Sequence, residues 1–324
     1  MNRCPSCLRE GFETFCGPCS KRLFGGKKVD PILPFTKPEF MEVRLNNSTR
    51  LSISGLQIKY SAKLEGKKLI ITEKAGEYIL KPVPIGTFKD LNEVPANEHL
   101  SMQLAGQIFK INTPPNALMH FADGEQVYIV KRFDVLPDGK KMLQEDFAQV
   151  AEKSEETGGK NYKYDFSYEE IAALMKKFLP AYMVEVEKYF RLVLFNYIIC
   201  NGDAHLKNFS LLRTIDFGDY KLSPAYDLMN TSIHVPGERD TALELFADSY
   251  MTEAFKYGNK YTRIDFEEFG VRIGLVPTRV AKIIDSYISV YEKLSGLVER
   301  SFLSEFAKDL YLFSAAKRIE RIKN

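Results

Sequence analysis

The segment Asn201-Gly-Asp-Ala-His-Leu-Lys-Asn-Phe-Ser210 decides how the rest of the chain is interpreted. Apolar residues of the stretch before it, Met183–Asn201, recur with the 3.6-residue spacing of a helix, so the segment is expected to be the loop that leaves this helix. Polar and charged side chains set between apolar runs are costly to bury unless they are hydrogen-bonded. The segment is therefore either a surface loop with satisfied polar groups or part of a functional site.

Asp203 and Asn208 have the spacing of a known catalytic loop. They lie five positions apart, as do the Asp and Asn of the D-x-x-x-x-N loop of protein kinases. In that loop the Asp accepts the proton of the attacking hydroxyl and the Asn holds Mg²⁺. Lys207 lies between them and can neutralise charge on a phosphoryl group in transfer. Taken alone, the pair is weak evidence, because a surface loop also explains it.

A carboxylate that binds metal is expected further along, after a hairpin. Asp216-Phe217-Gly218 has the letters of the kinase metal motif, but it lies between two predicted strands, Phe209–Arg213 and Tyr220–Leu222. Because a strand rises about 3.3 Å per residue, the turn of this hairpin is about 15 Å from Asn208. The returning strand brings the chain back to Asp227, which we predict to be the Mg²⁺ ligand.

The first half of the chain must supply groups that bind phosphate. Lys81 ends a predicted strand, and Glu98 on the helix that follows is its natural partner. The alternative for a strand lysine is a position in solvent. Residues Leu51–Lys59 are rich in hydroxyl groups and contain Gly55, which allows the backbone to approach a phosphate closely. This segment is neither a Walker A motif nor GxGxxG, and it is a weak indication by itself.

The composition is that of an ordinary globular protein. The chain has 324 residues, of which 45% are hydrophobic and 27% charged, enough for one large domain or two ordinary ones. Lys and Arg number 45 against 43 Asp and Glu, which argues against a mainly electrostatic nucleic-acid binder. No apolar run approaches the ~20 residues of a membrane-spanning helix, and the polar N-terminus does not resemble a signal peptide. We expect a soluble, cytoplasmic protein.

Four of the five cysteines lie within the first 19 residues. Cys4-x2-Cys7 and Cys16-x2-Cys19 are two CxxC pairs, each able to clamp one side of a tetrahedral Zn²⁺ ion. Two disulfides are the alternative, which is disfavoured because cytosolic thiols stay reduced. Four thiolates leave no coordination position for water, so we predict that the zinc is structural and not catalytic. Cys200 lies in an apolar stretch and is expected to be buried.

Two halves of different character follow these cysteines, which indicates an α+β fold. The predicted strands are Met41–Leu45, Lys59–Leu64, Lys68–Thr72, Glu77–Pro82 and Gln126–Phe133. The predicted helices are Val94–Phe109, Tyr168–Leu179, Met183–Asn201, Asp265–Phe269, Thr278–Lys293 and Leu297–Ile322. We expect a zinc-knuckle segment over 1–25, a linker over 26–41, a β-rich N-lobe over 42–143 and an all-helical C-lobe over 144–324 that carries the catalytic loop and the hairpin. A site is expected where the two lobes meet.

Taken together, these residues resemble the HipA family of serine/threonine kinases, the toxins of bacterial type II toxin–antitoxin systems. The matching strings occur in order over residues 42–320: Ser52-Ile-Ser-Gly-Leu-Gln-Ile-Lys59, Tyr78-Ile-Leu-Lys81, Lys131-Arg-Phe-Asp134, Gln144-Glu-Asp146, Asp203-Ala-His-Leu-Lys-Asn-Phe-Ser210 and Ser223-Pro-Ala-Tyr-Asp227. The resemblance implies a two-lobe, protein-kinase-like α/β fold and MgATP-dependent phosphoryl transfer to a Ser or Thr hydroxyl of a protein.

The resemblance also implies roles for individual residues. Asp203 would be the catalytic base, with His205 and Lys207 close to the phosphates. The implied ATP-binding residues are Ser54, Gly55, Leu56, Gln57, Ile58, Lys59, Lys81, Lys131, Arg132, Phe133, His205, Lys207, Asn208, Tyr226 and Asp227, and Asn208 and Asp227 would hold Mg²⁺. Residues 131–133 would be the hinge that reads adenine through its backbone. Ser52, with Ser54 second, would be the autophosphorylation site, because a phosphoserine places close to two negative charges where ATP phosphates must lie.

The chain departs from the family in three places. It has 51 residues before Ser52, fewer than full-length HipA proteins, and so looks like the short form, similar to HipT, in which the missing subdomain is a separate small protein. Lys131 stands where family members often have Glu. The four-cysteine knuckle is not a general family feature, and we consider it either a structural staple or a docking element for a partner.

The implied partners are all proteins. They are a protein substrate, for which the family precedent is an aminoacyl-tRNA synthetase, a HipB-like antitoxin, and a HipS-like small protein. DNA would be contacted only indirectly, and no membrane is implied. Two other functions stay open at this point: a kinase acting on a small molecule or lipid, and an inactive kinase-fold adaptor that binds a partner through the knuckle.

Overall fold

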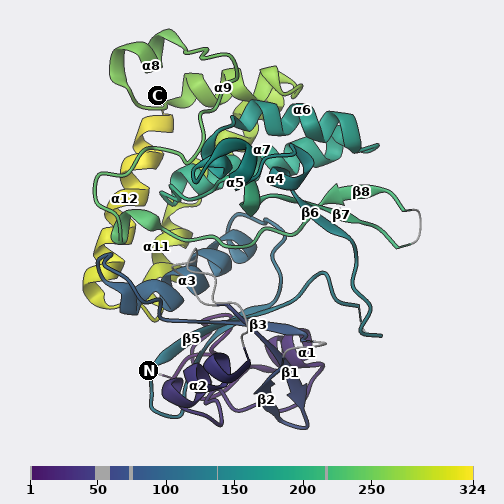
Figure 1. Ribbon diagram of the computed structural model, residues 1–324. Helices are drawn as coiled ribbons and strands as arrows, with labels where there is room; N and C mark the ends of the chain where they lie inside the picture. The colour runs from purple at the N-terminus through teal and green to yellow at the C-terminus, as the bar shows by residue number, and fades with distance from the viewer. Residues whose placement is uncertain (1, 48–58, 73–75, 137, 216–217, 324) are drawn as a thin grey trace.

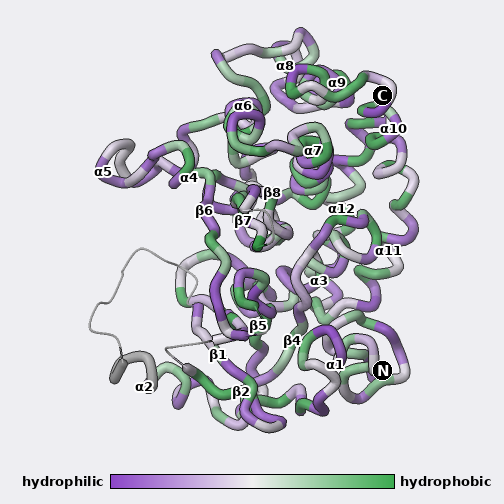
Figure 2. The backbone as a smooth tube through the Cα atoms, turned by 90° about the vertical axis from the view of Figure 1, so that its right-hand side faces the viewer, coloured by the Kyte–Doolittle hydropathy of each residue, from purple (hydrophilic) through white to green (hydrophobic). Residues whose placement is uncertain are grey.

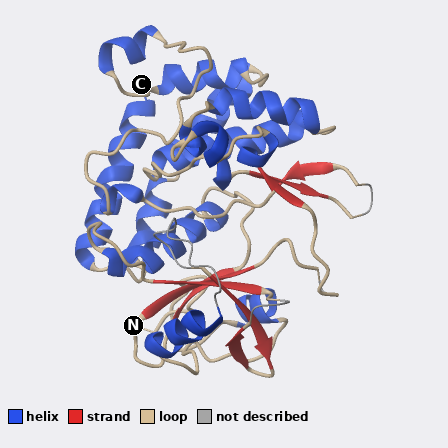
Figure 3. Cartoon of the chain, in the orientation of Figure 1, coloured by secondary structure: helices blue, strands red, loops and turns tan. Residues whose placement is uncertain are grey.

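The computed structural model describes residues 2–47, 59–72, 76–136, 138–215 and 218–323 of the chain. These residues form a strand-rich lobe and a larger helical lobe, and the helical lobe lies above the other in Figure 1. Figure 3 shows how strands and helices divide between the two lobes. Among these residues, no helix is long and apolar enough to cross a membrane.

The N-lobe is built on a five-stranded antiparallel sheet with the strand order β2-β1-β3-β5-β4. Its elements are α1 (Gly17–Phe24), α2 (Lys37–Asn47), β1 (Tyr60–Glu65), β2 (Lys68–Ile71), β3 (Tyr78–Pro82), the 3-10 helix η1 (Leu91–Glu93), α3 (Val94–Gln107), β4 (Asn116–His120) and β5 (Gln126–Lys131). β1, β2, β3, β5 and α3 confirm predicted elements. The edge strand β4 was not predicted, because two prolines precede it and its apolar residues do not alternate with polar ones.

The side chains of β3 alternate between the two faces of this sheet, as the two-residue period of a strand requires. Tyr78 and Leu80 point into a core shared with α1 and α2. Ile79 packs against the large core that includes α3 and the C-lobe. Lys81 is therefore expected on the α3 face by its position alone, and its contacts confirm this orientation.

The segment 41–45, predicted to be a strand, is helical and lies within α2, so that prediction was wrong. A capping box starts the helix: Thr36 donates its backbone N–H and its hydroxyl to the carboxylate of Glu39, and the Glu39 N–H donates back to the Thr36 hydroxyl at 3.3 Å. Pro38, in the first turn, has a backbone angle suited to a helix. These start signals outweigh the short alternation of apolar residues on which the strand prediction rested.

Residues 26–41, predicted to be a linker, are packed against the sheet. Val29, Leu33 and Phe40 are buried in the core on the α1 face. The Leu33 N–H donates to the carbonyl group of His120 at 2.7 Å, at the edge of β4. The Pro and Gly residues that suggested a loose connection instead shape an irregular segment that covers one face of the sheet.

Over its described residues, the C-lobe is helical apart from one small antiparallel sheet with the order β6-β7-β8. Its elements are β6 (Gln144–Asp146), α4 (Phe147–Val150), α5 (Glu155–Gly158), η2 (Tyr162–Tyr164), α6 (Tyr168–Phe178), α7 (Tyr182–Ile198), η3 (Leu206–Asn208), β7 (Ser210–Arg213), β8 (Tyr220–Leu222), η4 (Thr231–Ile233), α8 (Glu253–Gly258), α9 (Arg263–Arg272), α10 (Pro277–Ile288), α11 (Tyr291–Glu299) and α12 (Glu305–Lys323). β7 and β8 are the predicted hairpin, and α7 leads into the loop of Asp203 as expected.

The long helix predicted over 297–322 is two helices, α11 and α12, with a break at residues 300–304. Ser304 accounts for the break, because its hydroxyl accepts the N–H of Ala307 at 3.3 Å and so caps the start of α12. α3 lies between the N-lobe sheet and the C-lobe helices, where it contacts β4, β5 and α11 (Figure 2). Twelve of its residues are buried, so α3 belongs to both lobes.

Candidate active site

Three charged side chains from three elements meet where the lobes join. Lys81 on β3 and Glu98 on α3 form an ion pair, and their side chains are 2% and 3% exposed. Asp227, which follows β8 in the C-lobe, accepts a hydrogen bond from the same ammonium group. Lys59 Nζ lies 2.8 Å from the other carboxylate oxygen of Asp227. Two cations of the N-lobe thus share one carboxylate of the C-lobe.

The charges of this network follow from two opposing effects. Burial disfavours every charged form, but at Lys81 the carboxylates of Asp227 and Glu98 outweigh it and raise the pKa of the ammonium group. At Asp227 burial is likewise outweighed, by Lys81 and Lys59, which lower the pKa of the carboxyl group. Burial raises the pKa of Glu98, and Lys81 opposes this rise. Lys81 and Asp227 are therefore ionised at neutral pH.

Asp203 lies in the loop after α7, and half of its side chain (51%) is exposed. The hydroxyl of Tyr164, at the end of η2, donates a hydrogen bond to its carboxylate. Nε2 of His205 lies 3.7 Å from the same carboxylate oxygen. The rings of Tyr164 and His205 meet edge to face with centroids 5.2 Å apart. Asp203 is accordingly an accessible carboxylate that is oriented by a tyrosine hydroxyl.

His205 is a neutral imidazole at pH 7. Burial lowers its pKa to about 4, although the nearby Asp203 opposes this shift and Lys163 adds to it. Its Nδ1 is buried and has no hydrogen-bond partner in the described part of the chain. His205 therefore brings no positive charge to the site at neutral pH. Its contacts with Tyr164 and Asp203 help to hold the loop in its conformation.

Asn208 and Tyr226 connect the loop to Asp227. Oδ1 of Asn208 accepts the backbone N–H of His205 at 3.2 Å. The hydroxyl of Tyr226 donates to the backbone carbonyl of Lys207 at 2.8 Å. Because Tyr226 directly precedes Asp227 and Lys207 directly precedes Asn208, this bond links the two segments that carry the predicted metal ligands. The side chain of Lys207 is exposed on the same loop.

The structure places one residue of the predicted hinge beside the site. The rings of Phe133 and Tyr226 lie 5.7 Å apart. The N–H groups of Lys131 and Arg132 donate to carbonyl groups of neighbouring N-lobe segments, both at 2.8 Å. The guanidinium of Arg132 also binds Asp134 (Nε to Oδ1, 2.9 Å). Phe133, a residue of the predicted hinge, therefore lies beside Tyr226, which directly precedes Asp227.

Most of the predicted phosphate loop lies outside the described residues. This holds for Ser52, Ser54, Gly55, Leu56, Gln57 and Ile58, and also for Asp216 and Phe217. Lys59 is described and contacts Asp227. Gly218 follows β7 with a φ of 71°, and its carbonyl accepts the Arg213 side chain at 3.2 Å, in agreement with a hairpin turn at this place.

Glu238, which was not among the predicted site residues, packs against the start of the loop that carries Asp203. A Cβ atom at Gly202 would lie 2.1 Å from Cδ of Glu238, so a side chain at this position would displace the Glu238 carboxyl group. The hydroxyl of Thr231 accepts the Gly202 N–H at 2.7 Å and donates to the Glu238 carboxyl group. Burial raises the pKa of Glu238 to about 7, and the nearby Asp203 adds to the rise. Gly202, directly before Asp203, was the one feature of the sequence that could have indicated a close contact at this position, because glycine lets another group approach the backbone.

An open cavity of about 480 Å³ borders Tyr164. Acidic side chains predominate among its charged lining residues, which are Asp165, Glu170, Glu244, Asp248 and Lys153. Aromatic rings, among them Phe246 and Tyr250, form much of the remaining wall. Tyr164, which lines the cavity, also binds Asp203, so one side chain connects the cavity wall with the accessible carboxylate.

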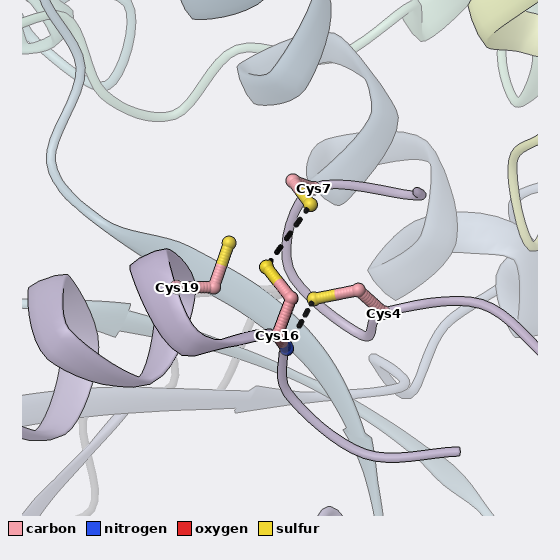
Figure 4. Close-up of side chains that lie close together, drawn as sticks. All are labelled: Cys4, Cys7, Cys16 and Cys19. Carbon is pink, nitrogen blue, oxygen red and sulfur yellow. Dashed lines mark hydrogen bonds between the residues drawn. The ribbon is translucent and has the colours of Figure 1, made fainter. Parts of the chain in front are cut away.

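The four N-terminal cysteines come together as predicted. Their thiols point towards a common centre (Figure 4), and all four sulfur atoms lie within 4.8 Å of one another. The sulfur atoms of Cys7 and Cys16 are 3.7 Å apart, and all four cysteines are free thiols. A tetrahedron with metal–sulfur bonds of about 2.3 Å has edges of about 3.8 Å. The cluster therefore fits a tetrahedral Zn²⁺ ion.

Comparisons with known proteins agree with this geometry. Residues 51–294 match the family model described as HipA-like C-terminal domain. A Haemophilus influenzae protein named "Putative kinase" is 30% identical over 314 residues, which cover 92% of this chain and 89% of that protein. The serine/threonine-protein kinase toxin HipA of Shewanella oneidensis is 24% identical over 211 residues, covering 60% of this chain and 47% of that protein.

Two solved structures share the fold. A chain of the Shewanella oneidensis toxin–antitoxin complex of HipA, HipB and operator DNA has a TM-score of 0.63 at 19% identity, covering 92% of this chain and 72% of that one. The Helicobacter pylori proinflammatory kinase CtkA has a TM-score of 0.52 at 13% identity, covering 81% and 90%. These likenesses confirm the two-lobe, kinase-like fold. Because the family model matches most of its length, the chain belongs to the HipA-like kinase family.

Proposed function

We propose that this protein is a MgATP-dependent serine/threonine kinase of the HipA type that phosphorylates a protein. The observation that best supports the proposal is the meeting of Lys81, Glu98 and Asp227 beside the loop of Asp203. In protein kinases a strand lysine held by a helix glutamate binds the ATP phosphates, and an acidic residue of the other lobe binds the metal. Membership of the HipA-like family agrees with this assignment.

The N-lobe residues would hold the nucleotide. Lys81 is charged and oriented by Glu98, so its ammonium group is suited to bind phosphate oxygens. Lys59 adds a second cation at the end of the predicted phosphate loop, residues 54–59. Phe133 lies where a hinge residue can contact the adenine ring. The remaining residues of that predicted loop would supply backbone N–H groups that cradle the phosphates.

The residues after α7 would hold the metal and the acceptor. Asn208 and Asp227 offer amide and carboxylate oxygens, which are ligands that Mg²⁺ prefers. When bound, the metal would neutralise charge that develops on the phosphates. Asp203 would accept the proton of the acceptor hydroxyl, and the Tyr164 hydroxyl would orient its carboxylate. Lys207, exposed on the same loop, would neutralise charge on the phosphoryl group.

A protein acceptor is supported by the cavity beside Tyr164. It is open and acidic, and Tyr164 in its wall binds Asp203, so it can accommodate residues that flank a Ser or Thr hydroxyl. The family resemblance makes a translation-related protein, such as an aminoacyl-tRNA synthetase, the proposed target. A HipB-like antitoxin is the proposed partner, since the solved HipA neighbour comes from a complex with HipB and operator DNA. A HipS-like small protein is a second proposed partner, on the resemblance to the short form.

Phosphorylation of Ser52 or Ser54 would switch the kinase off. A phosphoserine in the loop that ends at Lys59 would compete with ATP phosphates for the same cations. The proposal therefore includes autoinhibition at this loop. We also propose that the four cysteines hold one structural Zn²⁺ ion, because their spacing fits a tetrahedron and leaves no open coordination position.

Incubation of the purified chain and its Asp203→Asn variant with labelled ATP, Mg²⁺ and a bacterial lysate tests the reaction. We expect labelled protein bands, and phosphate on Ser52 or Ser54 by mass spectrometry, with the unmodified chain and not with the variant. Native mass spectrometry should find one zinc per chain. A labelled metabolite without labelled protein would instead identify a small-molecule kinase. Stoichiometric ATP binding without any turnover would identify an inactive adaptor, and either result overturns the proposal.

A further inference from the structure

The knuckle formed by residues 4–19 attaches to two different elements of the N-lobe. Its first CxxC pair contacts α3, the helix that carries Glu98, and its second pair begins α1, which packs beside β3, the strand of Lys81. Figure 2 shows α1 and the N-terminus beside β4 and below α3. The two elements that the knuckle joins from outside are the same two that the Lys81–Glu98 ion pair joins at the active site.

The first pair is attached to α3 by two hydrogen bonds to its backbone. Nε2 of His99 lies 2.7 Å from the carbonyl oxygen of Ser6, and because a carbonyl can only accept, the ring is the donor. Nε2 of Gln107 donates to the carbonyl oxygen of Cys7 at 3.1 Å. His99 is fully buried and follows Glu98 directly. A shift of the first pair therefore moves the turn of α3 that positions Glu98.

The first pair is also built into the fold and does not lie loosely on its surface. The Ser6 hydroxyl donates to the carbonyl of Asn116 at 2.7 Å, and the Leu118 N–H donates to the carbonyl of Pro5 at 2.9 Å, both on the edge strand β4. The side chain of Leu8 is fully buried in the large core. The chain thereby holds this half of the knuckle against α3 and β4 together.

The second pair is attached to β3 through α1. Cys16 is the residue before α1, and Cys19 lies in its first turn. At the other end of α1, the carbonyl of Leu23 accepts the hydroxyl of Tyr78 at 2.7 Å, and the rings of Phe24 and Tyr78 lie 5.8 Å apart. Tyr78 precedes Lys81 by three residues on β3 and points to the opposite face of the sheet.

We propose that a metal ion bound by the four thiolates fixes α3 relative to β3 and so sets the geometry of the Lys81–Glu98 pair. The ion bonds to both CxxC pairs and closes a continuous connection from α3 to β3. Apart from the ion, the two pairs are joined by the eight residues between Cys7 and Cys16 and by a hydrogen bond from the Cys16 N–H to the Cys4 sulfur at 3.3 Å. His99 is a positioning residue in this arrangement, because it touches the knuckle and not the substrate. The consequence for nucleotide binding rests on the proposed kinase function.

Metal binding and nucleotide binding should therefore be coupled. A nucleotide bound to Lys81 favours the arrangement of β3 and α3 that the metal also favours. Linkage then requires that the metal raise nucleotide affinity by the same factor by which the nucleotide raises metal affinity. Couplings of this kind typically amount to about 5- to 150-fold.

The first experiment compares the zinc-loaded full chain with the chain treated with a chelator under reducing conditions. Amide hydrogen exchange measured by mass spectrometry should accelerate in α3 at least about fivefold on metal removal, and the affinity for Mg²⁺ and AMP-PNP should fall by at least about fivefold. Exchange in α9, which is remote from the knuckle, should not change. Faster exchange confined to residues 2–25, with α3 unaffected, would overturn the proposal.

The reciprocal measurement follows the release of zinc to a chromogenic chelator. Saturating Mg²⁺ and AMP-PNP should raise the affinity of the protein for zinc by the same factor as in the first experiment, so that at a fixed chelator concentration less zinc is transferred to the chelator. Zinc partitioning that does not respond to the nucleotide, although the nucleotide binds, would contradict the coupling. If AMP-PNP does not bind even the zinc-loaded chain, the proposed kinase function fails, and hydrogen exchange in α3 alone decides whether the metal positions this helix.

A His99→Phe variant tests the hydrogen bond between α3 and the knuckle without changing the metal ligands. The ring keeps its place in the core but cannot donate to Ser6, so zinc should still bind while α3 exchange and AMP-PNP affinity become insensitive to zinc. Thr14→Ala, an exposed change between the CxxC pairs, is the matched control and should behave like the unmodified chain. Full coupling in a His99→Phe variant that binds zinc would overturn the assignment of His99.

Discussion

Asp227 and Asp203, the two carboxylates of the proposed site, are held in opposite ways. Asp227 binds Lys59 and Lys81, and Lys81 is 2% exposed and paired with Glu98 as well. Asp203 is 51% exposed, and the hydroxyl of Tyr164 is its hydrogen-bond donor from a side chain of the same lobe. One carboxylate thus belongs to a buried network that joins the lobes, and the other stands at the edge of solvent.

This difference separates residues that support the fold from residues that can be changed without harm to it. Removal of one member of a buried ion pair leaves an uncompensated charge and costs about 3–5 kcal/mol. An exposed carboxylate with one hydrogen bond contributes about 1 kcal/mol or less. Variants of Asp203 should therefore report on chemistry alone, and variants of the Lys81 network on folding and nucleotide binding together.

Asp203→Asn should give the largest effect on the reaction. An amide cannot accept the proton of the acceptor hydroxyl, so phosphoryl transfer should fall by about 10²–10⁴-fold. Thermal unfolding and AMP-PNP affinity should stay close to those of the unmodified chain, because the side chain is half exposed. Asp285→Asn, an exposed carboxylate on α10, is the control and should leave the rate unchanged. A normal rate in the Asp203→Asn variant would exclude Asp203 as the base.

Lys81→Met should destabilise the protein as well as weaken nucleotide binding. It leaves the carboxylates of Glu98 and Asp227 without their shared cation, so the free energy of unfolding in urea should fall by about 3 kcal/mol. Addition of Glu98→Gln to this variant should restore part of the loss, because it removes a buried negative charge that has lost the Lys81 ammonium group. Lys68→Met, exposed on β2, is the matched control. Independent, additive losses in the double variant would show that the two residues do not form one network.

His205 should make stability depend on pH. Burial lowers its folded-state pKa to about 4, whereas an unfolded histidine has a pKa of about 6.5, so its contribution is present above pH 6.5 and is lost as the pH falls towards 4. Relative to a His205→Gln variant, the unmodified chain should lose about 2 kcal/mol of unfolding free energy between pH 7 and pH 5. Urea unfolding of both proteins at the two pH values measures this. A constant difference would mean that the imidazole is not neutral and buried.

Tyr164→Phe should have the smallest effect. It removes the hydroxyl that orients Asp203 and with it a hydrogen bond of about 1 kcal/mol, so kcat should fall about fivefold while the KM for ATP stays unchanged. Tyr162→Phe, in the same turn, is the control. A rate loss as large as that of Asp203→Asn would show that Tyr164 itself takes part in the proton transfer.

The sequence predicted the elements whose signals are local and repeated. The 3.6-residue spacing indicated α7, the two-residue spacing indicated β3, and the D-x-x-x-x-N spacing indicated the loop between Asp203 and Asn208. It failed where a local signal was ambiguous. The alternation in residues 41–45 suggested a strand, but the capping box at Thr36 starts a helix, and the apolar run of β4 has no period that separates a strand from a helix.

The long-range contacts of the site lay beyond the reach of such signals. Tyr164 and Asp203 are 39 residues apart in the chain, and Ser6 and His99 are 93 apart. Glu238 became visible as a neighbour of Gly202 only when the fold brought the two together. Contacts of this kind depend on how whole elements pack, and no local period encodes them.

The sequence by itself determined the residue types and spacings that carry the chemistry: two CxxC pairs, a strand lysine, a helix glutamate and the loop that ends at Asn208. These features are local, since each lies within one element or one turn of the chain. Only the tertiary structure decided that Asp227 shares Lys81 with Glu98, and that the knuckle is attached to both α3 and β3. Such arrangements arise because burial of apolar faces fixes the elements against one another, and polar side chains then meet where that packing places them.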